Sequence, residues 1–308
     1  MSLRKLGSEY GSAILERVLQ TNVLDKWMSQ CIHGFRRHTR SKSTNINCLR
    51  GKTALVTGST SGIGLSVARP LAENGCNIVY TGFSDKQHID NIKSELEKHE
   101  YVKAVYIDAD LSNSDDIARL GDQINNKVPE GIDILVNNAG FQHVSLVEEC
   151  SAKKWDSMLT VMLTAPFLLT QHFIPAMRCK GWGRIINMAS AHGHVASPRK
   201  AGYVTCKHGI IGLTKVVALE TAGSGVTCNA VCPGYVNTPL FQEQVTSLST
   251  NRGITYKEAE VEFLSRYHET KQAVDVCDVA SLVLYLCSNA ASQITGSSLV
   301  IDGGWTAK

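Results

Sequence analysis

The sequence predicts an α/β fold in which a doubly wound parallel sheet of seven strands carries helices on both faces. Three observations predict this fold class. Short β-branched runs alternate with helical patterns from Gly51 onward, and a glycine-rich turn follows the first of these runs. In addition, Tyr203 and Lys207 stand four residues apart in a late helical segment.

The alternation of strands and helices covers residues 51–308. The predicted strands are Thr53–Thr57, Asn77–Thr81, Lys103–Ile107, Asp133–Asn137, Arg184–Met188, Thr227–Val231 and Ser298–Ile301. The predicted helices are Ile63–Asn74, Lys86–His99, Ser114–Asn126, Ala152–Met177, Ala201–Thr221 and Val274–Ser288. Strands that alternate with helices form right-handed βαβ units around a parallel sheet. We therefore expect one Rossmann-type domain.

Residues 1–50 differ in composition from this domain. Leu3 to Leu19 shows apolar residues at helical spacing, and Cys31–Arg50 is basic and rich in hydroxyl residues, with no Asp or Glu. Such a leader is typical of a mitochondrial transit peptide, which predicts the mitochondrial matrix as the location. Glu9, Glu16 and Asp25 argue against this interpretation. A flexible cytosolic extension, and hence a cytoplasmic protein, is the alternative.

Composition restricts the classes of function. The net charge of +3 is too small to indicate a nucleic-acid partner. There is no run of 18 apolar residues, so we expect no membrane span. Cysteines in apolar runs are expected to be buried and reduced, and we expect no metal site. These cysteines are Cys76, Cys206, Cys228, Cys232 and Cys277.

A glycine-rich turn joins the first predicted strand to the first helix, with the sequence TGSTSGIG. Glycines at such a turn let the backbone approach a pyrophosphate, and the helix N-terminus offers free amide donors. We therefore predict a bound dinucleotide. The residues of the turn expected to contact it are Gly58, Ser59, Ser61, Gly62, Ile63 and Gly64.

Further cofactor contacts are expected where later strands end. Phe83 follows the second strand, Asp110 and Leu111 follow the third, and Asn138-Ala139-Gly140 follows the fourth. No Arg or Lys lies in the glycine turn or directly after the second strand, so a 2′-phosphate has no evident partner. This favours NAD over NADP, although Lys86 is near and no Asp ends the strand.

Tyr203, Lys207 and Ser190 form the candidate catalytic group. The spacing of Tyr203 and Lys207 puts both side chains on one helix face. An ammonium about 4 Å from a phenol favours phenolate by roughly 4 kcal/mol at an effective dielectric of ~20. We therefore expect Lys207 to lower the pKa of Tyr203. Ser190 follows a buried strand, at the sheet edge where ligands bind.

These motifs together resemble the short-chain dehydrogenase/reductase family. TGSTSGIG, NNAG, Ser190, Tyr203-x-x-x-Lys207 and Pro233-Gly234 occur in its order and spacing. The resemblance implies that Tyr203 takes the substrate hydroxyl proton, that Ser190 binds the same oxygen and that Lys207 binds the nicotinamide ribose. It also implies that the cofactor contacts Tyr203, Lys207, Pro233, Gly234, Val236 and Thr238.

Within the family the chain is similar to the soluble D-3-hydroxybutyrate dehydrogenases. Phe141-Gln-His-Val144, Ala191-His-Gly193 and Cys232–Leu240 carry this resemblance. It implies NAD-linked interconversion of (R)-3-hydroxybutyrate and acetoacetate in a homotetramer. The substrate residues it implies, several of them for the carboxylate, are Gln142, Ser190, His192, Lys200, Tyr203 and Gln244. A protonatable His192 and Lys200 can neutralise one carboxylate.

Two further features concern turnover. Residues 240–272 mix apolar and charged residues in the way expected of a two-helix lid. Met162 replaces the asparagine that the family uses in catalysis, and its carbonyl is the one expected to hold a water near Lys207. Pro166 has no N–H for that carbonyl and its ring should bend the helix there. We therefore predict that Pro166 frees the Met162 carbonyl for the water and partly replaces the lost side chain. The alternative is that Pro166 only bends a helix at a subunit contact.

Two alternatives remain at this stage. One keeps the fold and changes the substrate to another secondary alcohol or oxo-acid. The other takes Met162 as the mark of a weakly active, NAD-binding homologue.

Overall fold

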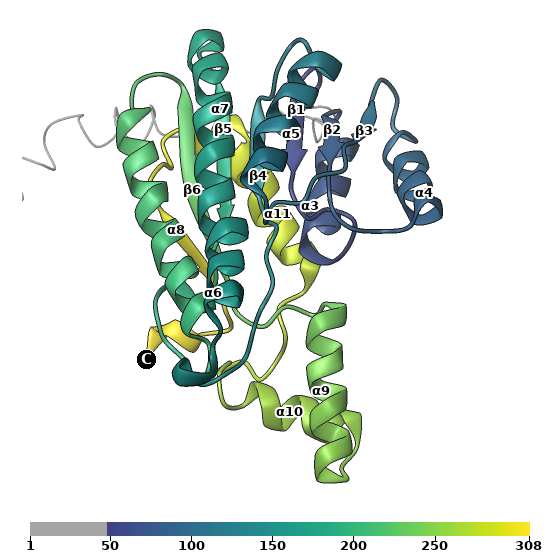
Figure 1. Ribbon diagram of the computed structural model, residues 1–308. Coiled ribbons are helices and arrows are strands. Elements are labelled where there is room, and N and C mark those ends of the chain that lie inside the picture. Colours follow the sequence, from purple (N-terminus) through teal and green to yellow (C-terminus); the bar gives the residue numbers. More distant parts are fainter. Residues whose placement is uncertain (1–47) are drawn as a thin grey trace, which may run out of the picture. The chain divides into compact units, whose positions relative to one another are not determined.

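Seven parallel strands form one sheet in the order β3-β2-β1-β4-β5-β6-β7 (Figure 1). The computed structural model describes residues 48–308, so nearly all of the predicted leader lies outside the described residues. The strands are β1 Thr53–Val56, β2 Asn77–Tyr80, β3 Ala104–Tyr106, β4 Ile134–Asn137, β5 Gly183–Met188, β6 Val226–Pro233 and β7 Ser298–Ile301. All seven predicted strands are present, and the predicted fold class is confirmed.

The strands carry apolar side chains on both faces of the sheet, and helices cover both faces and bury these side chains. In β4, for example, Ile134 and Val136 face one apolar core and Leu135 faces the other. The first face is covered by α3 Gly62–Glu73, α4 Lys86–Leu96 and α11 Val276–Cys287. The second is covered by α5 Ser114–Lys127, α7 Ala165–Lys180 and α8 Ala201–Glu220.

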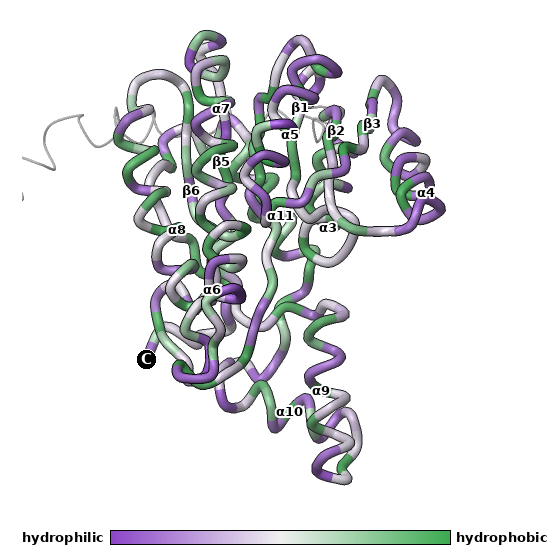
Figure 2. Tube along the Cα trace, viewed as in Figure 1, coloured by the Kyte–Doolittle hydropathy of each residue, from purple (hydrophilic) through white to green (hydrophobic). Residues whose placement is uncertain are grey.

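Helix α4 shields the β3 edge with little apolar surface. It is mostly hydrophilic (Figure 2), and only Ile92 and Leu96 are buried. The Asp85 side chain caps its first turn by accepting the N–H of His88 at 2.8 Å. The helix ends at Leu96, three residues before the predicted end.

The long helix before β5 is interrupted beside Pro166, where a bend was predicted, although the π-helical form of the interruption was not. It consists of α6 Ala152–Leu159, a π-helical turn over Thr160–Thr164, and α7. The N–H of Ala165 donates to the carbonyl of Thr160, five residues back. Pro166 has no N–H to donate to Met162, so the regular α pattern cannot continue there.

The helix over 152–180 is apolar enough to resemble a membrane span by length and composition, with a mean hydropathy of 1.3. In this structure its apolar face packs against the sheet. Leu169, Phe173 and Met177 are buried in the second core.

Two short helices, α9 Pro239–Arg252 and α10 Tyr256–Leu264, project from the sheet at the predicted lid (Figure 1). Thr255 caps α10 and Glu258 returns the contact to the Thr255 N–H at 2.9 Å. Apolar side chains of both helices pack on residues beyond β6 and β7. The buried members of this lid cluster are Ala191, Tyr235, Phe241, Val245, Ala259, Leu264 and Trp305.

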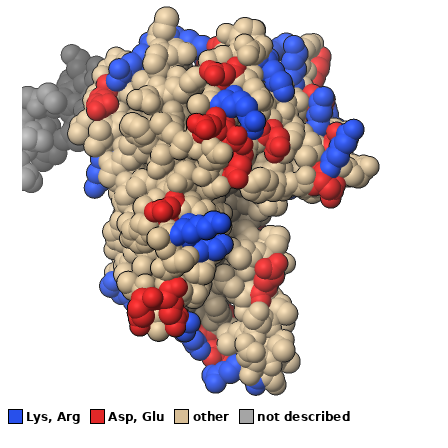
Figure 3. Space-filling view, viewed as in Figure 1, with Lys and Arg blue, Asp and Glu red and all other residues tan. Residues whose placement is uncertain are grey.

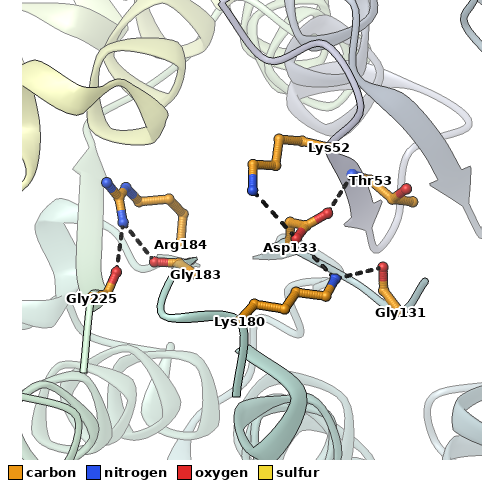
Figure 4. A network of polar contacts seen from close by, with 8 residues as sticks. All are labelled: Lys52, Thr53, Gly131, Asp133, Lys180, Gly183, Arg184 and Gly225. Carbon is orange, nitrogen blue, oxygen red and sulfur yellow. Dashed lines mark hydrogen bonds and ion pairs between the residues drawn. The ribbon is translucent and has the colours of Figure 1, made fainter. Parts of the chain in front are cut away.

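A polar network lies at the amino ends of the strands (Figure 4). Asp133, 5% exposed, accepts a hydrogen bond from Lys180 at 2.9 Å and from the Thr53 N–H at 2.9 Å. The Lys52 ammonium lies 3.7 Å away from the same carboxylate. Arg184 donates to the carbonyls of Gly183 and Gly225. These contacts tie β1, β4 and β5 together at the sheet edge opposite the cavity described below.

The cysteine prediction is confirmed at four positions and wrong at one. Cys76, Cys206, Cys228 and Cys232 are buried free thiols, but Cys277 is exposed. Cys277 lies in the first turn of α11, where its N–H donates to the N-cap Asp275 at 2.7 Å. That turn faces outward, which the apolar run around Cys277 did not reveal.

Candidate functional site

A cavity of about 670 Å³ opens at the carboxyl ends of the strands. This is where ligands bind in open α/β sheets. Its walls come from the glycine turn after β1, the loops after β2, β3 and β4, and the starts of α8 and α9. Figure 3 shows a notch between the lid and the rest of this face, with charged side chains of both signs scattered around it.

Most of the predicted cofactor residues line this cavity. They are Gly58, Ser61, Gly62, Ile63, Phe83, Asp110, Leu111, Asn138, Ala139, Gly140, Tyr203, Lys207, Pro233 and Thr238. Ser59, Gly64, Gly234 and Val236 do not line it. Ser59 is fully buried and donates to the carbonyl of Val56 at 2.6 Å. Its role here is to hold the turn.

The glycine turn fits a pyrophosphate. Gly58 has φ +63°, and a Cβ at Gly64 would overlap the Gly58 carbonyl and stand 2.6 Å from the Asn138 amide. Helix α3 therefore starts tight against β1 and β4. The N-cap Ser61 makes no side-chain capping bond, and no acidic residue occupies the first turn. The first amides of α3 are thus left for an anion.

The adenosine end is lined by Phe83, which is 75% exposed, and by Asp110 and Ser112. Among the residues in 48–308 that line the cavity, Lys207 is the only Lys or Arg. Lys86, the cation nearest to Phe83 in sequence, instead lines a separate surface hollow beside Asp90. Within the described part of the chain, the cavity wall near Phe83 offers no cation for a 2′-phosphate.

Ser190, Tyr203 and Lys207 converge at the other end of the cavity. Ser190 directly follows β5, where its hydroxyl accepts the His192 N–H at 3.2 Å and donates to the Pro233 carbonyl at 3.4 Å. Tyr203 and Lys207 lie one turn apart on α8, as their spacing predicts. The Lys207 ammonium donates to the Met188 carbonyl at 2.6 Å and lies 5.5 Å from the Tyr203 ring centroid.

The expectation that Lys207 lowers the pKa of Tyr203 is wrong for this geometry. Burial raises the pKa of Tyr203, and hydrogen bonds with Ser190 and Gln142 offset that rise in part. Burial also lowers the pKa of Lys207 to about 8. The ammonium donates its hydrogen bond to the Met188 carbonyl rather than to the phenol, so the direct stabilisation of a phenolate that the sequence suggested is not formed here.

His192 lies beside Tyr203 and Lys200 lies near His192, although neither is among the residues that line the cavity, and His192 differs in charge from the expectation. The His192 ring is 5.8 Å from the Tyr203 ring and 4.8 Å from the Trp305 ring, centroid to centroid. Burial, together with the nearby Lys200, lowers the pKa of His192 to about 3. His192 is therefore neutral at physiological pH and shares a hydrogen bond of 2.9 Å with Ser197. Lys200 alone supplies positive charge among the predicted carboxylate residues.

Gln142 and Gln244 have different positions. Gln142 lines the cavity beside Tyr203, and its Oε1 is buried without a partner. Gln244 lies half-buried on α9 and does not line the cavity. The structure thus puts Gln142 in the cavity wall, His192 and Lys200 outside the lining but on the Tyr203 side, and Gln244 on the lid.

Met162 contributes packing rather than polar chemistry. Its side chain is 2% exposed and packs with Met158 and Cys206. A Cβ at Gly140 would stand 3.1 Å from the Met162 sulfur, so the side chain also supports the loop after β4. The sulfur cannot replace the hydrogen bonds of an amide, and Met162 can act in the site only through its main chain.

Several lining residues were not predicted. Thr60, Gly82, Ser112, Ser157, Met188 and Leu240 line the cavity, and Tyr235 and Trp305 pack beside His192 and Lys200. Thr60 and Gly82 are next to residues that were predicted to bind the cofactor. Their positions directly after strands could therefore have identified them from the sequence. Tyr235 and Trp305 gave no local signal, because only the packing of the lid brings them to the site.

Comparison with known proteins shows which protein family shares these motifs. Residues 58–306 match the family model described as Enoyl-(Acyl carrier protein) reductase. A D-beta-hydroxybutyrate dehydrogenase of Rhizobium meliloti is 47% identical over 257 residues, covering 83% of this chain and 99% of the relative. The D-beta-hydroxybutyrate dehydrogenase of Cupriavidus necator is 45% identical over 263 residues, covering 84% and 100%.

Solved structures support the same fold. L-sorbose reductase from Gluconobacter frateurii, in complex with NADPH and L-sorbose, superimposes with a TM-score of 0.80 at 25% identity, covering 86% of this chain and 100% of that one. A putative NAD(P)-dependent gluconate 5-dehydrogenase from Beutenbergia cavernae, with NADP bound at low occupancy, superimposes with a TM-score of 0.74 at 33% identity, covering 84% and 98%.

Proposed function

The chain belongs to the short-chain dehydrogenase/reductase family of nicotinamide-dependent oxidoreductases, and we propose that it interconverts (R)-3-hydroxybutyrate and acetoacetate. The observation that carries this proposal is the position of Lys200. Its ammonium is close enough to neutral His192 to help lower the pKa of that ring. The His192 ring in turn lies 5.8 Å from the Tyr203 ring, centroid to centroid. A small hydroxy acid whose carboxylate pairs with Lys200 while its hydroxyl meets Tyr203 suits this arrangement of charge.

The residues divide the chemistry as follows. When bound, the nicotinamide ring supplies the hydride acceptor or donor. Tyr203 exchanges a proton with the substrate oxygen, and Ser190 donates a hydrogen bond to that oxygen. Because burial raises its pKa, Tyr203 holds its proton at neutral pH, which suits it to act as the acid in ketone reduction. Lys200 pairs with the carboxylate and fixes which face of the substrate meets the ring.

NAD is the proposed cofactor. Supporting this choice, Phe83 and Asp110 line the adenosine end, and the neighbouring Lys86 points into another surface hollow. An acidic side chain at this end repels a 2′-phosphate and leaves a ribose hydroxyl unopposed. The expected preference is measured as the ratio of kcat/KM for NAD to that for NADP, and a ratio below one contradicts the choice.

The activity test mixes the purified full chain with NAD and (R)-3-hydroxybutyrate and follows absorbance of the reduced cofactor. We expect turnover with this enantiomer, little with the (S) form, and a loss of about 10³-fold in kcat for Tyr203→Phe. Larger hydroxy acids and neutral secondary alcohols form the comparison panel. Higher kcat/KM for a neutral alcohol than for hydroxybutyrate contradicts the proposed substrate, and absence of turnover on the whole panel supports a non-catalytic role.

Two further proposals concern assembly and location. We propose a homotetramer, supported by exposed apolar side chains on α7 and α8 at Phe167, Val216 and Leu219. Sedimentation of the parent and of Leu219→Lys tests this assembly, and a monomeric parent contradicts it. We also propose that the leader directs the protein to the mitochondrial matrix, which imaging of the full chain and of a chain lacking residues 1–47 tests.

A further inference from the structure

The Lys200 ammonium has one side-chain hydrogen-bond acceptor within residues 48–308, the hydroxyl of Tyr235. The Nζ–Oη distance is 3.3 Å, and the ammonium lies 5.4 Å from the centroid of the Tyr235 ring. The hydroxyl is thus closer to the charge than the ring face is. A flexible lysine chain that reaches a fixed acceptor loses rotamer freedom before any ligand binds.

Tyr235 is itself held firmly. Its ring is 9% exposed and stacks on Trp305 at a centroid distance of 5.4 Å with planes 3° apart. Phe241 of α9 and Phe263 of α10 pack on the same ring at 6.2 and 4.7 Å. Its N–H donates to Nε2 of buried His268 at 2.8 Å. The hydroxyl position is therefore fixed by the lid cluster rather than by the helix that bears Lys200.

The backbone before Lys200 is also constrained. Arg199 adopts φ +67°, a left-handed conformation that costs a residue with a side chain free energy. The Arg199 carbonyl accepts the Ser145 N–H at 3.0 Å, which ties this turn to the loop that carries Gln142. Lys200 is consequently anchored at both ends, by its backbone near Gln142 and by its ammonium at Tyr235.

We propose that Tyr235 is a positioning residue that orients Lys200 toward the substrate carboxylate and couples this orientation to the packing of the lid. The inference rests on the proposed function, because it needs a carboxylate substrate. Tyr235 does not touch the reacting atoms. It acts by holding the ammonium, which is half-buried and has little water to replace the hydroxyl.

Tyr235→Phe removes the hydroxyl and keeps the stacked ring. We expect KM for (R)-3-hydroxybutyrate to rise about tenfold, as for loss of a hydrogen bond to a charged group, with kcat changed less than about twofold. The methyl ester of the same acid has no carboxylate, so its kcat/KM is expected to change less than about twofold. The matched control is Tyr256→Phe, on the exposed side of α10, which is expected to leave both substrates unaffected.

A double-mutant cycle tests whether Tyr235 acts through Lys200. In a Lys200→Ala background, the further change Tyr235→Phe is expected to leave KM for hydroxybutyrate within about twofold, whereas independent effects would multiply. The inference is overturned if Tyr235→Phe leaves KM for hydroxybutyrate unchanged, or if its effect on KM multiplies fully with that of Lys200→Ala. It is also overturned if Tyr235→Phe lowers kcat/KM for the ester as much as for the acid. Thermal unfolding of each variant shows whether the fold is kept.

The outcomes separate this inference from the proposed function. A parent enzyme that turns over the ester better than the acid overturns the proposed substrate. If the parent enzyme prefers the acid, but Tyr235→Phe leaves KM for the acid unchanged, only the positioning role of Tyr235 is overturned.

Discussion

The ammonium of Lys207 donates a hydrogen bond to the main-chain carbonyl of Met188 at 2.6 Å, across the end of β5. A buried cation is thereby held by a neutral acceptor, which explains why burial lowers its pKa to about 8. The charged form of Lys207, which the catalytic motif requires, therefore lowers the free energy of unfolding.

Lys207→Met is expected to lose at least about 10²-fold in kcat without loss of stability at pH 7. The folded protein releases the Lys207 proton near pH 8 and the unfolded chain near 10.5, so the unfolded state holds more protons between these values. The free energy of unfolding contributed by Lys207 therefore rises with pH, by on the order of 2 kcal/mol at pH 9.5. Urea unfolding of parent and variant at pH 7.5 and 9.5 measures the difference, and a constant gap between them contradicts this account.

His192→Gln is expected to make the fold less sensitive to acid. The pKa of His192 is about 3 when folded and 6.5 when unfolded, so the unfolded state holds more protons between these values. Stability is lost as pH falls through this window, by about 3 kcal/mol from this residue at pH 4. Acid titration followed by circular dichroism should show a lower unfolding midpoint for the variant. An identical midpoint means that His192 does not remain neutral in the fold.

Gly64→Ala is expected to weaken dinucleotide binding more than tenfold and to destabilise the fold by about 2 kcal/mol. The added methyl overlaps the Gly58 carbonyl, so the turn must move away from its present form. Fluorescence titration with the reduced cofactor measures binding. Ser66→Ala, two residues on in the same helix, is the control and should bind normally.

Asp133→Asn is expected to destabilise the fold by about 2 kcal/mol while leaving kcat/KM unchanged. It removes the charge that pairs with Lys180 and Lys52 at the sheet edge remote from the cavity (Figure 4). Glu262→Gln, which removes the charge that pairs with Arg252 and Arg266 on the lid, should have a clearly smaller effect because water screens these surface pairs. If the two variants lower the free energy of unfolding in urea equally, the burial of Asp133 does not strengthen its ion pairs.

Pro166→Ala tests the role of the π-helical turn. Alanine supplies an N–H that can donate to the Met162 carbonyl, which favours a regular α-helix over the π-helical turn. We expect kcat to fall several-fold and the pH profile to shift, with Pro175→Ala in the same helix as the control. Unchanged turnover with an unchanged pH profile rules out a role for Pro166 in catalysis.

The sequence determined the order of strands and helices, the glycine turn and the pair on α8, because each is encoded by local periodicity or spacing. The seven predicted strands and the positions of Tyr203 and Lys207 on one helix follow from neighbours in the chain alone. Family membership follows from the same local motifs.

Only the tertiary structure decided the charges and contacts of the site. Neutral His192, the Lys207–Met188 bond and the Lys200–Tyr235 contact depend on burial and on distances between residues far apart in the chain. The exposed position of Cys277 likewise arises from how α11 packs, whereas the π-helical turn before Pro166 has a local cause in the missing N–H of the proline. Desolvation and packing are properties of the assembled interior, which no local pattern of residue types specifies.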